Sequence, residues 1–409
     1  MRRLTLGMCL LCTASWAVSC GPVVQDEAGS PAGSGEPELN SEQRSAIERL
    51  SSIGYVGGTR IATKAGVTLH ETDRAQTGLN FFSSGHAPEA VLMDMDGAVV
   101  HRWHRGFFEL WPDSTESPHN PDTRWWRRCH LLPNGEVLAI FEGLGIAELD
   151  HESNVVWANA NGAHHDLAVL PDGGIYVLTR EAHIVPWYDP EQPVLEDFVS
   201  LLDSRGEEQS RFSLLEAFEQ SEQRGVWRDG GSRPGRRGDV FHTNSLEVLD
   251  GRLADRDPAF ARGNLLLSML KLDAIAVVDP RTRRVVWART GVFRRQHDPS
   301  ILPNGNLLLF DNVGLGERSR VLELDPLSLE TVWSYEGSDT RPFYSEKLGA
   351  SQRLSNGNTL ITESDGGRAF EVTPGGEIVW EFHNPHRTGD SGDLVARISE
   401  MRRLPPEED

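Results

Sequence analysis

Three histidines recur at comparable places along the chain, and they are the residues whose type and spacing best suit chemistry. His165 lies six residues before Pro171, and His297 lies six residues before Pro303. His242 stands at the start of a corresponding segment, FHTNSLEVL, which lacks the proline. A neutral imidazole, with an unperturbed pKa of about 6.5, acts as a nucleophile or as a general acid and base near neutral pH. The pattern predicts a site built from these three imidazoles.

A single histidine on an inner strand is more often a structural group than a catalytic one. Recurrence in three successive repeats favours a site, because matched positions of a circular repeat face one axis. His130 is a weaker candidate because it lies three residues before Pro133, and His164 would point away from His165 on a regular strand. Cys129 is expected to be an inert core thiol.

Repeated segments decide the expected fold. Four segments carry an Asn-Gly or Asp-Gly turn followed by an apolar strand: LPNGEVLAIF from Leu132, LPDGGIYVL from Leu170, LPNGNLLLF from Leu302 and LSNGNTLIT from Leu354. Six closing segments accompany them, VVHRW, NVVW, LLDSRGE, RVVW, TVW and EIVW. Units of about 40 to 50 residues with four strands are typical of propeller blades. The sequence therefore predicts an all-β, six-bladed β-propeller, with the closing tryptophans packed between blades.

The remaining segments suggest an order of parts along the chain. We expect a signal segment at residues 1–20, a flexible tether with a short helix at 21–65, the propeller at 66–388 and a tail at 389–409. An insertion at about residues 207–240 interrupts the repeats with a helix from Ser213 and a basic loop from Arg233 to Arg237. This loop is expected to be a solvated insertion on one face.

The N-terminal residues predict export. Arg2 and Arg3 precede an apolar run, and the residues around Cys20 resemble a lipobox, in which this cysteine becomes lipidated after cleavage. Cys129 would then have no partner within the mature chain, so no disulfide is expected. The predicted location is the periplasmic face of the outer membrane or the cell surface, with membrane contact through the lipid anchor only.

The charge balance excludes some partners. The chain carries 40 lysines and arginines against 61 aspartates and glutamates, a net charge of -21. Binding to nucleic acid or to anionic headgroups is therefore not expected. An anionic substrate would need a local cluster of positive groups.

Two of the histidine segments carry a family resemblance. GDVFHTNSLEV around His242 and QHDPSILPNGNLLLFDN from Gln296, followed by ERSRVLELD, resemble the arylsulfotransferase family, and the likeness covers most of residues 66–388. The resemblance implies a six-bladed periplasmic propeller that transfers a sulfuryl group from an aryl sulfate to a phenol without a nucleotide donor. No cofactor or metal is expected, and the chain lacks a Gly-rich phosphate-binding loop.

The resemblance also implies roles for particular residues. His242 and His297 match two sulfate-binding histidines and are the expected catalytic residues, with His165 and Asn244 assisting in substrate binding. Arg318 or Arg320 would supply an arginine near the sulfate, and the spacing leaves the choice between them open.

One departure from the family pattern leaves alternatives open. The family's nucleophilic histidine lies in the last blade, but the corresponding stretch from Asn358, NTLITESDGGRAFEV, contains no histidine; His383 and His386 come later. This departure favours a non-catalytic, lipid-anchored propeller that binds an anionic ligand or a partner protein. A quinone-dependent dehydrogenase, suggested by VVDPRTRRVVW, is disfavoured because six units and one body cysteine do not match the eight blades and vicinal cysteines of that class.

Overall fold

The computed structural model describes residues 39–51, 57–61, 63–228, 238–389 and 391–405. The expected signal segment with Cys20 and the basic loop from Arg233 to Arg237 lie outside these residues. None of the helices in the described part of the chain has the length and apolar character of a membrane-spanning segment.

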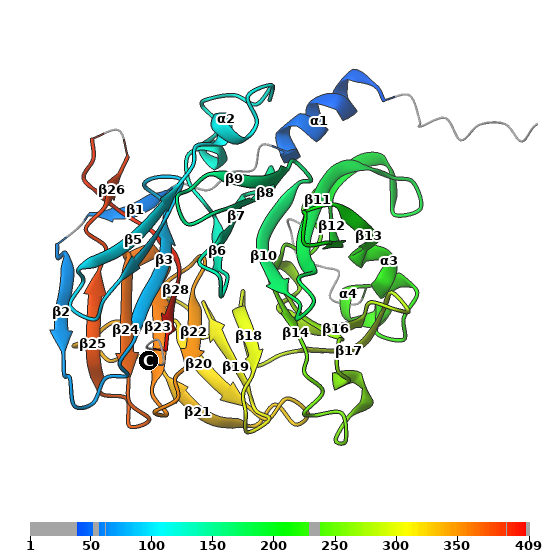
Figure 1. Ribbon diagram of the computed structural model, residues 1–409. Helices are drawn as coiled ribbons and strands as arrows, with labels where there is room; N and C mark the ends of the chain where they lie inside the picture. The colour runs from blue at the N-terminus through cyan, green and yellow to red at the C-terminus, as the bar shows by residue number, and fades with distance from the viewer. Residues whose placement is uncertain (1–38, 52–56, 62, 229–237, 390, 406–409) are drawn as a thin grey trace, which may run out of the picture. The chain divides into compact units, whose positions relative to one another are not determined.

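Six antiparallel sheets form the six blades of a β-propeller, which confirms the predicted fold class (Figure 1). We number the blades from the N-terminal end. The first three are blade 1, with β28 (Ile398–Leu404), β3 (Leu79–Ser84), β4 (Glu89–Met93) and β5 (Val99–His104); blade 2, with β6 (Arg128–Leu131), β7 (Val137–Phe141), β8 (Gly145–Leu149) and β9 (Val155–Asn159); and blade 3, with β10 (Ala163–Val169), β11 (Ile175–Val185), β12 (Asp189–Leu202) and β13 (Glu208–Ser213).

The other three blades follow in chain order. They are blade 4, with β14 (Thr243–Val248), β15 (Leu265–Met269), β16 (Ala274–Asp279) and β17 (Arg284–Thr290); blade 5, with β18 (His297–Ile301), β19 (Leu307–Asp311), β20 (Arg320–Leu324) and β21 (Thr331–Tyr335); and blade 6, with β22 (Ala350–Arg353), β23 (Thr359–Glu363), β24 (Arg368–Val372), β25 (Ile378–His383) and the added edge strand β2 (Gly66–His70). In each blade the first strand named is the innermost.

The Asn-Gly and Asp-Gly pairs make the turns between the first and second strands of the blades, as predicted. Gly135 and Gly305 both have φ of +85°, a left-handed conformation that glycine adopts without steric cost. The turns fix the register of the inner hairpins, so that Leu131 pairs with Val137 and Ile301 pairs with Leu307.

The C-terminal segment closes the ring. Strand β28 pairs with β3, with Met401 opposite Phe82, and becomes the inner strand of blade 1. The propeller therefore extends to Leu404, beyond the boundary expected at residue 388. Strand β28 pairs with the edge of β3 that would otherwise be unpaired. A small sheet of β1 (Gly58–Ile61), β27 (Leu394–Ala396) and β26 (Arg387–Thr388) lies beside this closure.

The closing tryptophans lie on the outermost strand made by the repeat, and several of them join neighbouring blades. The indole N–H of Trp103 donates to the carbonyl of Gly135 in blade 2 at 3.2 Å. Those of Trp333 and Trp380 donate to Pro374 in blade 6 and Met95 in blade 1, each at 2.8 Å. Each bond links an outer strand to a turn of the next blade, so these tryptophans hold the blades together in sequence.

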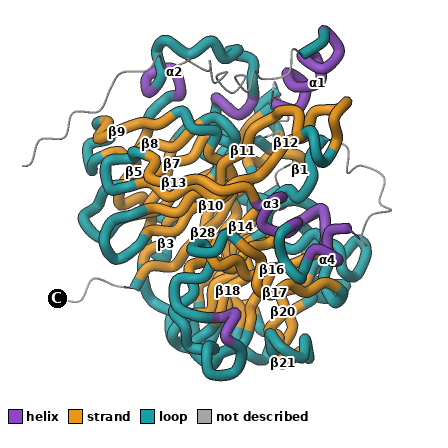
Figure 2. Tube along the Cα trace, turned by 90° about the vertical axis from the view of Figure 1, so that its right-hand side faces the viewer, coloured by secondary structure: helices purple, strands orange, loops and turns teal. Residues whose placement is uncertain are grey.

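The insertion after blade 3 is smaller than predicted. Residues 208–213 form β13, the outer strand of blade 3, whereas LLDSRGE was expected to be the closing segment. The reason is an unusually long hairpin of β11 and β12, which moves the fourth strand further along the chain. Helix α1 (Ser41–Ser51) lies against this hairpin (Figure 2). Gln43 donates to the carbonyl of Glu191 at 3.0 Å.

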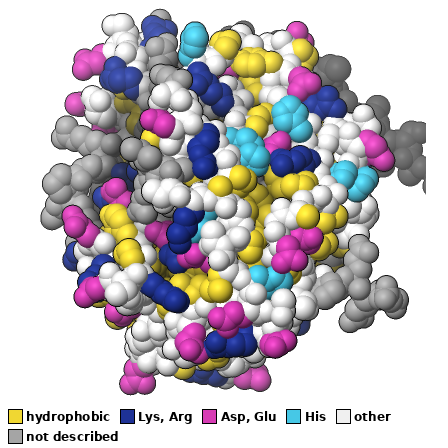
Figure 3. Space-filling view, turned by 90° about the vertical axis from the view of Figure 1, so that its left-hand side faces the viewer, with side chains coloured by type: hydrophobic (Ala, Val, Ile, Leu, Met, Phe, Trp, Pro, Cys, Tyr) yellow, Lys and Arg dark blue, Asp and Glu magenta, His cyan; other side chains and the backbone are white. Residues whose placement is uncertain are grey.

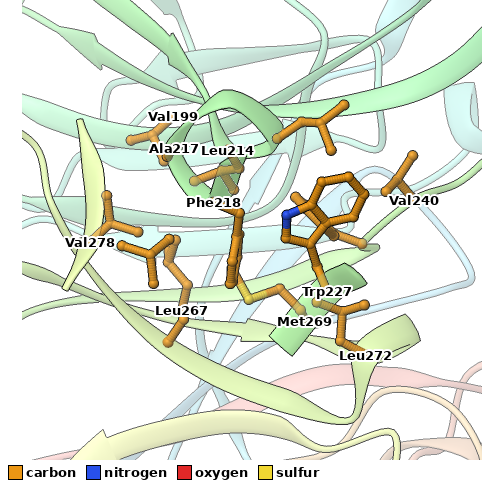
Figure 4. Close-up of a cluster of buried hydrophobic side chains, with 14 of the residues drawn as sticks. Val199, Leu214, Ala217, Phe218, Trp227, Val240, Leu267, Met269, Leu272 and Val278 are labelled. Atoms are coloured by element: carbon orange, nitrogen blue, oxygen red, sulfur yellow. The ribbon is translucent and has the colours of Figure 1, made fainter. Parts of the chain in front are cut away.

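Short helices cover the interface of blades 3 and 4. Helices α3 (Leu214–Glu219) and α4 (Arg224–Arg228) bury Phe218 and Trp227 against the strands of blade 4 (Figure 4). Leu267 in β15 lies in the same cluster and is completely buried. A further short helix, α2 (Phe107–Leu110), and single 3-10 turns at Pro121–Thr123, Pro258–Phe260, Leu270–Leu272 and Ser364–Gly366 lie in the connections.

Candidate functional site

Imidazoles from blades 3, 4 and 5 gather where the inner strands begin. The ring centroids of His165 and His242 lie 4.9 Å apart at an interplanar angle of 76°. His297 begins β18, and its ring lies within electrostatic reach of Arg127 and His242. The structure therefore brings together the three histidines that the sequence singled out. We call these residues, together with His164, the histidine cluster.

Backbone irregularities aim these side chains. His165 and His242 have φ of +52° and +51°, values that residues other than glycine rarely adopt. Strand β10 has a bulge between Ala163 and Leu167, and β18 has one between His297 and Ser300. Bulges re-aim side chains, and strained conformations concentrate at functional sites. The bulge also explains why His164, expected to point away, contacts His165, with their Nδ1 atoms 2.9 Å apart.

The strand register corrects the position assigned to His242. Counted back from the hairpin pairs Val169–Ile175, Val248–Leu265 and Ile301–Leu307, the residue that matches His165 and His297 is Asn244. His242 precedes β14 by one residue and reaches the cluster through its positive φ. Asn244 is buried and donates from Nδ2 to the carbonyl of Gln296 at 2.9 Å. Its Oδ1 has no hydrogen-bond partner among the described residues.

Arg127 occupies the same position on blade 2. It lies six residues before Pro133, the spacing that singled out His165 and His297, and sequence reasoning missed it by considering only histidines. Arg127 is 4% exposed. A search for any ionisable residue at this spacing would have found it.

Glu142 lies at the centre of the charged groups. Its carboxylate is 2.9 Å from Nη1 of Arg180, 3.8 Å from Nε of Arg127 and 3.0 Å from Nδ1 of His165. Gly143, at φ +70°, makes room for this arrangement, because a Cβ there would lie 2.3 Å from Arg180 Nη2. The two guanidiniums are thus fixed beside the imidazoles.

Groups beside the histidines come from the second strands: Glu142 and Asn312 directly follow β7 and β19, and Arg180 lies within β11. Glu142, Arg180 and Asn312 are each the sixth residue counted from the start of β7, β11 and β19. Asn312 donates from Nδ2 to the carbonyls of Ser345 and Leu348, so its Oδ1 accepts from Nδ1 of His297 at 2.8 Å. These residues were missed in the sequence because only the register places strand ends beside the axis.

The hydrogen bonds fix the tautomers of the rings. His297 carries its proton on Nδ1, since Asn312 Oδ1 and the carbonyl of Arg295 both accept there. Asp239 accepts from Nδ1 of His242 at 2.6 Å. Nε2 is therefore the basic nitrogen of both rings, which is the arrangement of a nucleophile or base oriented by a second group.

Burial keeps most of the imidazoles uncharged. It lowers the pKa of His297 to about 3 and the pKa values of His164 and His165 well below the ordinary value. Burial opposes ionisation of Glu142, but His165 and Arg180 hold its pKa well below the usual range. Glu142 is thus a carboxylate beside neutral rings.

Two aspartates complete the charge balance of the cluster. Burial acts to raise the pKa of Asp239, but His242 and Lys271 keep it below the usual value. Burial, followed by the charge of Asp239, raises the pKa of Asp197 to about 7. Arg127, Arg180 and Lys271 therefore face two ionised carboxylates, Glu142 and Asp239, with Asp197 titrating near neutrality. The cluster suits an anion despite the negative charge of the chain.

The arginines expected from the family resemblance lie elsewhere. Arg318 is exposed and pairs with Asp339 at 2.7 Å. Arg320 pairs with Asp311 at 2.7 Å and donates to the carbonyl of Val292. The family resemblance placed one of them near the sulfate, whereas β20 is the third strand of blade 5 and lies away from the inner strand β18. The arginines that lie beside the imidazoles are Arg127 and Arg180.

The last blade brings no imidazole to the cluster. Ser364 occupies the strand-end position that Asn312 has in blade 5, and Arg368 pairs with Glu363 and Glu381. His383 contacts Glu381, and His386 stacks on His86. Arg368 and His383 line a pocket of about 550 Å³ with Lys64 and Arg341. Basic and acidic side chains are interspersed on the side of the molecule that carries this blade (Figure 3).

A layer of buried ion pairs follows the histidine cluster along the inner strands. Arg128 contacts Asp166 at 2.9 Å, Arg402 contacts Asp298 at 2.7 Å, and both arginines contact Glu400. Asp166 and Asp298 directly follow His165 and His297. The layer joins the C-terminal strand β28 to blades 2, 3 and 5.

Two other residues considered from the sequence are not part of the cluster. His130 is exposed. Cys129 is buried, and burial raises the pKa of its thiol to about 12, so that it stays protonated.

Comparison with known sequences decides the family. The sequence profile of arylsulfotransferase (ASST) matches residues 128–385, which is more than half of the chain and includes blades 2 to 6. The chain belongs to the arylsulfotransferase family. Membership supports sulfuryl transfer as the reaction and small aryl compounds as substrates. None of the curated protein sequences matches this chain.

One similar solved structure has a TM-score above 0.5 and supports the fold. A protein of unknown function from Bacteroides caccae is 14% identical, with a TM-score of 0.51 over 79% of this chain and 98% of the other. A streptogramin B lyase is 11% identical, with a TM-score of 0.42 over 85% and 95%. Virginiamycin B lyase from Staphylococcus aureus is 10% identical, with a TM-score of 0.37 over 69% and 84%.

Proposed function

We propose that this member of the arylsulfotransferase family transfers a sulfuryl group from an aryl sulfate to a phenolic acceptor at the histidine cluster. The observation that carries the proposal is the meeting of His165, His242 and His297 with the guanidiniums of Arg127 and Arg180 in one buried place. Transfer of this kind depends mostly on positioning and on stabilising charge, which this arrangement supplies.

The two buried guanidiniums are the proposed sulfate-binding groups. Planar, permanently charged forks match the oxygens of a sulfuryl group, and Arg127 and Arg180 are already held in place by Glu142. Lys271, whose side chain is more exposed, lies 4.0 Å from Asp239 at the edge of the cluster. Its charge would attract an anionic donor toward the arginines.

His242 is the proposed nucleophile. Its side chain is the most exposed of the three axial imidazoles, and Asp239 fixes Nε2 as the basic nitrogen. Nε2 attacks sulfur, an N–S bond forms, and the bond from sulfur to the aryl oxygen breaks with its electron pair on the departing phenolate. The phenolate takes a proton from water. This assignment replaces the missing histidine of the last blade.

His297 and Asn244 serve the acceptor in the second half of the reaction. Nε2 of His297 takes the proton of the acceptor phenol, whose oxygen attacks sulfur while the N–S bond breaks and its electron pair returns to His242. His297 then releases the proton to water. A bound sulfuryl group raises the pKa of a neighbouring imidazole, because negative charge favours its protonated form. The unpaired Oδ1 of Asn244 can accept from the phenol hydroxyl.

The test is transfer from a chromogenic aryl sulfate to an added phenol, with the sulfated phenol detected by mass spectrometry. His242→Ala should abolish transfer and the mass gain of one sulfuryl group on the protein, and His297→Ala should slow the second half-reaction. His130→Ala, which changes an exposed histidine, is the matched control. Unchanged turnover in both cluster variants would remove the assignment.

A second candidate is a propeller that binds an anionic ligand without turning it over. The absence of a histidine from the last-blade stretch favours it. Binding of an aryl sulfate that is lost in Arg127→Ala, with no transfer to any phenol, would select this function.

We also infer that the chain is exported and lipid-anchored through Cys20, on the basis of the lipobox-like residues before it. Labelling with radioactive palmitate in cells should mark the wild type and not Cys20→Ala. Equal labelling of both would contradict the anchor.

A further inference from the structure

We propose that His86, Glu89 and His386 form a binding site for a divalent transition metal of the zinc class, separate from the histidine cluster. The site belongs to the closure of the propeller. His86 and Glu89 flank the turn between β3 and β4, and His386 lies in the connection between β25 and β26. The inference does not depend on the proposed sulfuryl transfer.

The donor atoms are already close together. Nε2 of His86 lies 3.0 Å from a carboxylate oxygen of Glu89, and one ligand atom from each of the three residues falls within 4.8 Å of the others. Donors around a tetrahedral zinc ion at its usual bond lengths are about 3.4 Å apart. Small side-chain rotations bring the three atoms to this spacing. Two imidazoles and one carboxylate are a known ligand set for zinc with one open position.

The rings of the two histidines would have to tilt on binding. Their centroids lie 3.7 Å apart with an angle of 5° between the planes. The lone pairs of parallel rings do not converge on one ion, so metal binding would open this angle. Face-to-face stacking holds the pair together in the absence of the ion.

Neighbouring groups hold the three ligands in orientation through hydrogen bonds. Nδ1 of His86 lies 2.5 Å from Oγ of Ser84, which directs Nε2 toward Glu89. The backbone of His386 is held at both sides: its N–H donates to Asn384 Oδ1 at 3.1 Å, and its carbonyl accepts from Ala396 at 3.1 Å. The ligands thus stand on fixed backbone positions.

Charge and exposure favour the site at His86, Glu89 and His386 over a second group of three possible metal ligands. Glu142, His164 and His165 also lie within ligand distance of one another, but two buried guanidiniums share the carboxylate of Glu142. At Glu89 the competing cation is Arg102, 2.5 Å away, whose side chain is 39% exposed and can move into solvent. A metal ion can reach His86 and Glu89, whose side chains are 14% and 13% exposed.

The position gives metal binding a structural consequence. An ion held by His86, Glu89 and His386 would join the first hairpin of blade 1 to the segment that leads into β28. Binding only to the folded chain stabilises it. We therefore expect zinc to raise the melting temperature as well as to bind.

The experiment uses full-length protein treated with EDTA and then dialysed. Calorimetric titration with Zn²⁺ should give one equivalent bound, and Co²⁺ should give the visible absorption of a four-coordinate ion. His386→Ala and the more conservative Glu89→Gln should lose this binding and the thermal shift. Ser84→Ala should weaken binding by about tenfold, because it removes the hydrogen bond that orients the ring of His86.

A second stacked histidine pair supplies the control. His101 and His151 have ring centroids 3.8 Å apart at 14°, and no carboxylate joins them in a three-residue ligand group among the described residues. His151→Ala should leave zinc binding unchanged. The proposal is overturned if the wild type binds no Zn²⁺ at micromolar concentration, or if Glu89→Gln binds it as the wild type does. Sulfuryl transfer that persists in EDTA is expected, because the proposed metal site is separate from the histidine cluster.

Discussion

The imidazole rings of His165 and His242, from neighbouring blades, meet edge to face with their centroids 4.9 Å apart. Each ring has its own carboxylate: Glu142 contacts Nδ1 of His165 at 3.0 Å, and Asp239 contacts Nδ1 of His242 at 2.6 Å. Two oriented imidazoles beside fixed guanidiniums are a favourable place for an anion.

The arginines of the cluster should matter where the arginines expected from the sequence do not. Removing one preorganised charge donor typically costs about 100-fold in rate, so we expect Arg127→Ala and Arg180→Ala to lower kcat/KM for an aryl sulfate by about this factor. Arg318→Ala should stay near the wild-type value, because Arg318 pairs with Asp339 at the surface. Steady-state kinetics of the three variants test this. A larger loss of kcat/KM in Arg318→Ala than in Arg127→Ala and Arg180→Ala would contradict the site.

Asp239 should act through His242. In Asp239→Asn the amide can present its NH₂ group to Nδ1, which favours the tautomer whose Nε2 carries the proton and is not nucleophilic. We expect kcat to fall by about 100-fold with little change in KM. Asp250→Asn, at an exposed pair with Arg252, is the matched control. An increase in KM with unchanged kcat would show that Asp239 contributes to substrate binding and does not orient His242.

Burial of His297 should make the folded protein sensitive to acid. Its pKa is about 3 in the folded chain and about 6.5 when unfolded, so between these values the unfolded chain binds the extra proton. The stabilising contribution is complete above pH 6.5 and is lost as the pH falls toward 3. At pH 5 the loss is about 2 kcal/mol relative to pH 7.

Other buried groups act in the opposite sense, so the effect is best measured as a difference. Burial raises the pKa of Glu247 to about 8, and such a group stabilises the folded state as the pH falls. Urea unfolding at pH 7 and pH 5 should show a smaller acid loss for His297→Gln than for the wild type. Equal losses in the two proteins would mean that His297 is charged when folded.

The packing of blades 3 and 4 should depend on Leu267. This side chain is completely buried among Phe218, Met269 and their neighbours (Figure 4). Leu267→Ala should lower the free energy of unfolding by about 2 to 5 kcal/mol through lost burial and a cavity. Val156→Ala, at a half-exposed position of β9, should change it by less than about 0.5 kcal/mol. Denaturant titration of both variants makes the comparison.

Much of the fold followed from local signals in the sequence. The Asn-Gly turns at residues 134–135 and 304–305 fix tight hairpins, because glycine alone adopts the required left-handed backbone without strain. The tryptophans at the outer strands marked the units. The long β11–β12 hairpin was missed, since extra residues in a hairpin carry no local signal that separates them from an insertion.

The site was only partly accessible to the same reasoning. His165 and His297 were found because they share a spacing from a turn, and Arg127 shares it too. His242 was placed at the matched position, which the register gives to Asn244. Arg318 and Arg320 were put near the sulfate, but strand β20 carries them away.

The sequence by itself determined the repeats and their number. It also indicated which residues of the inner strands face the axis, because their spacing from each hairpin turn is a local property. Only the tertiary structure decided which groups meet at the axis, including Glu142, Arg180 and Asp239. Their approach depends on the register of second strands, on a bulge and on backbone at positive φ, and these are fixed by packing between blades that lie far apart along the chain.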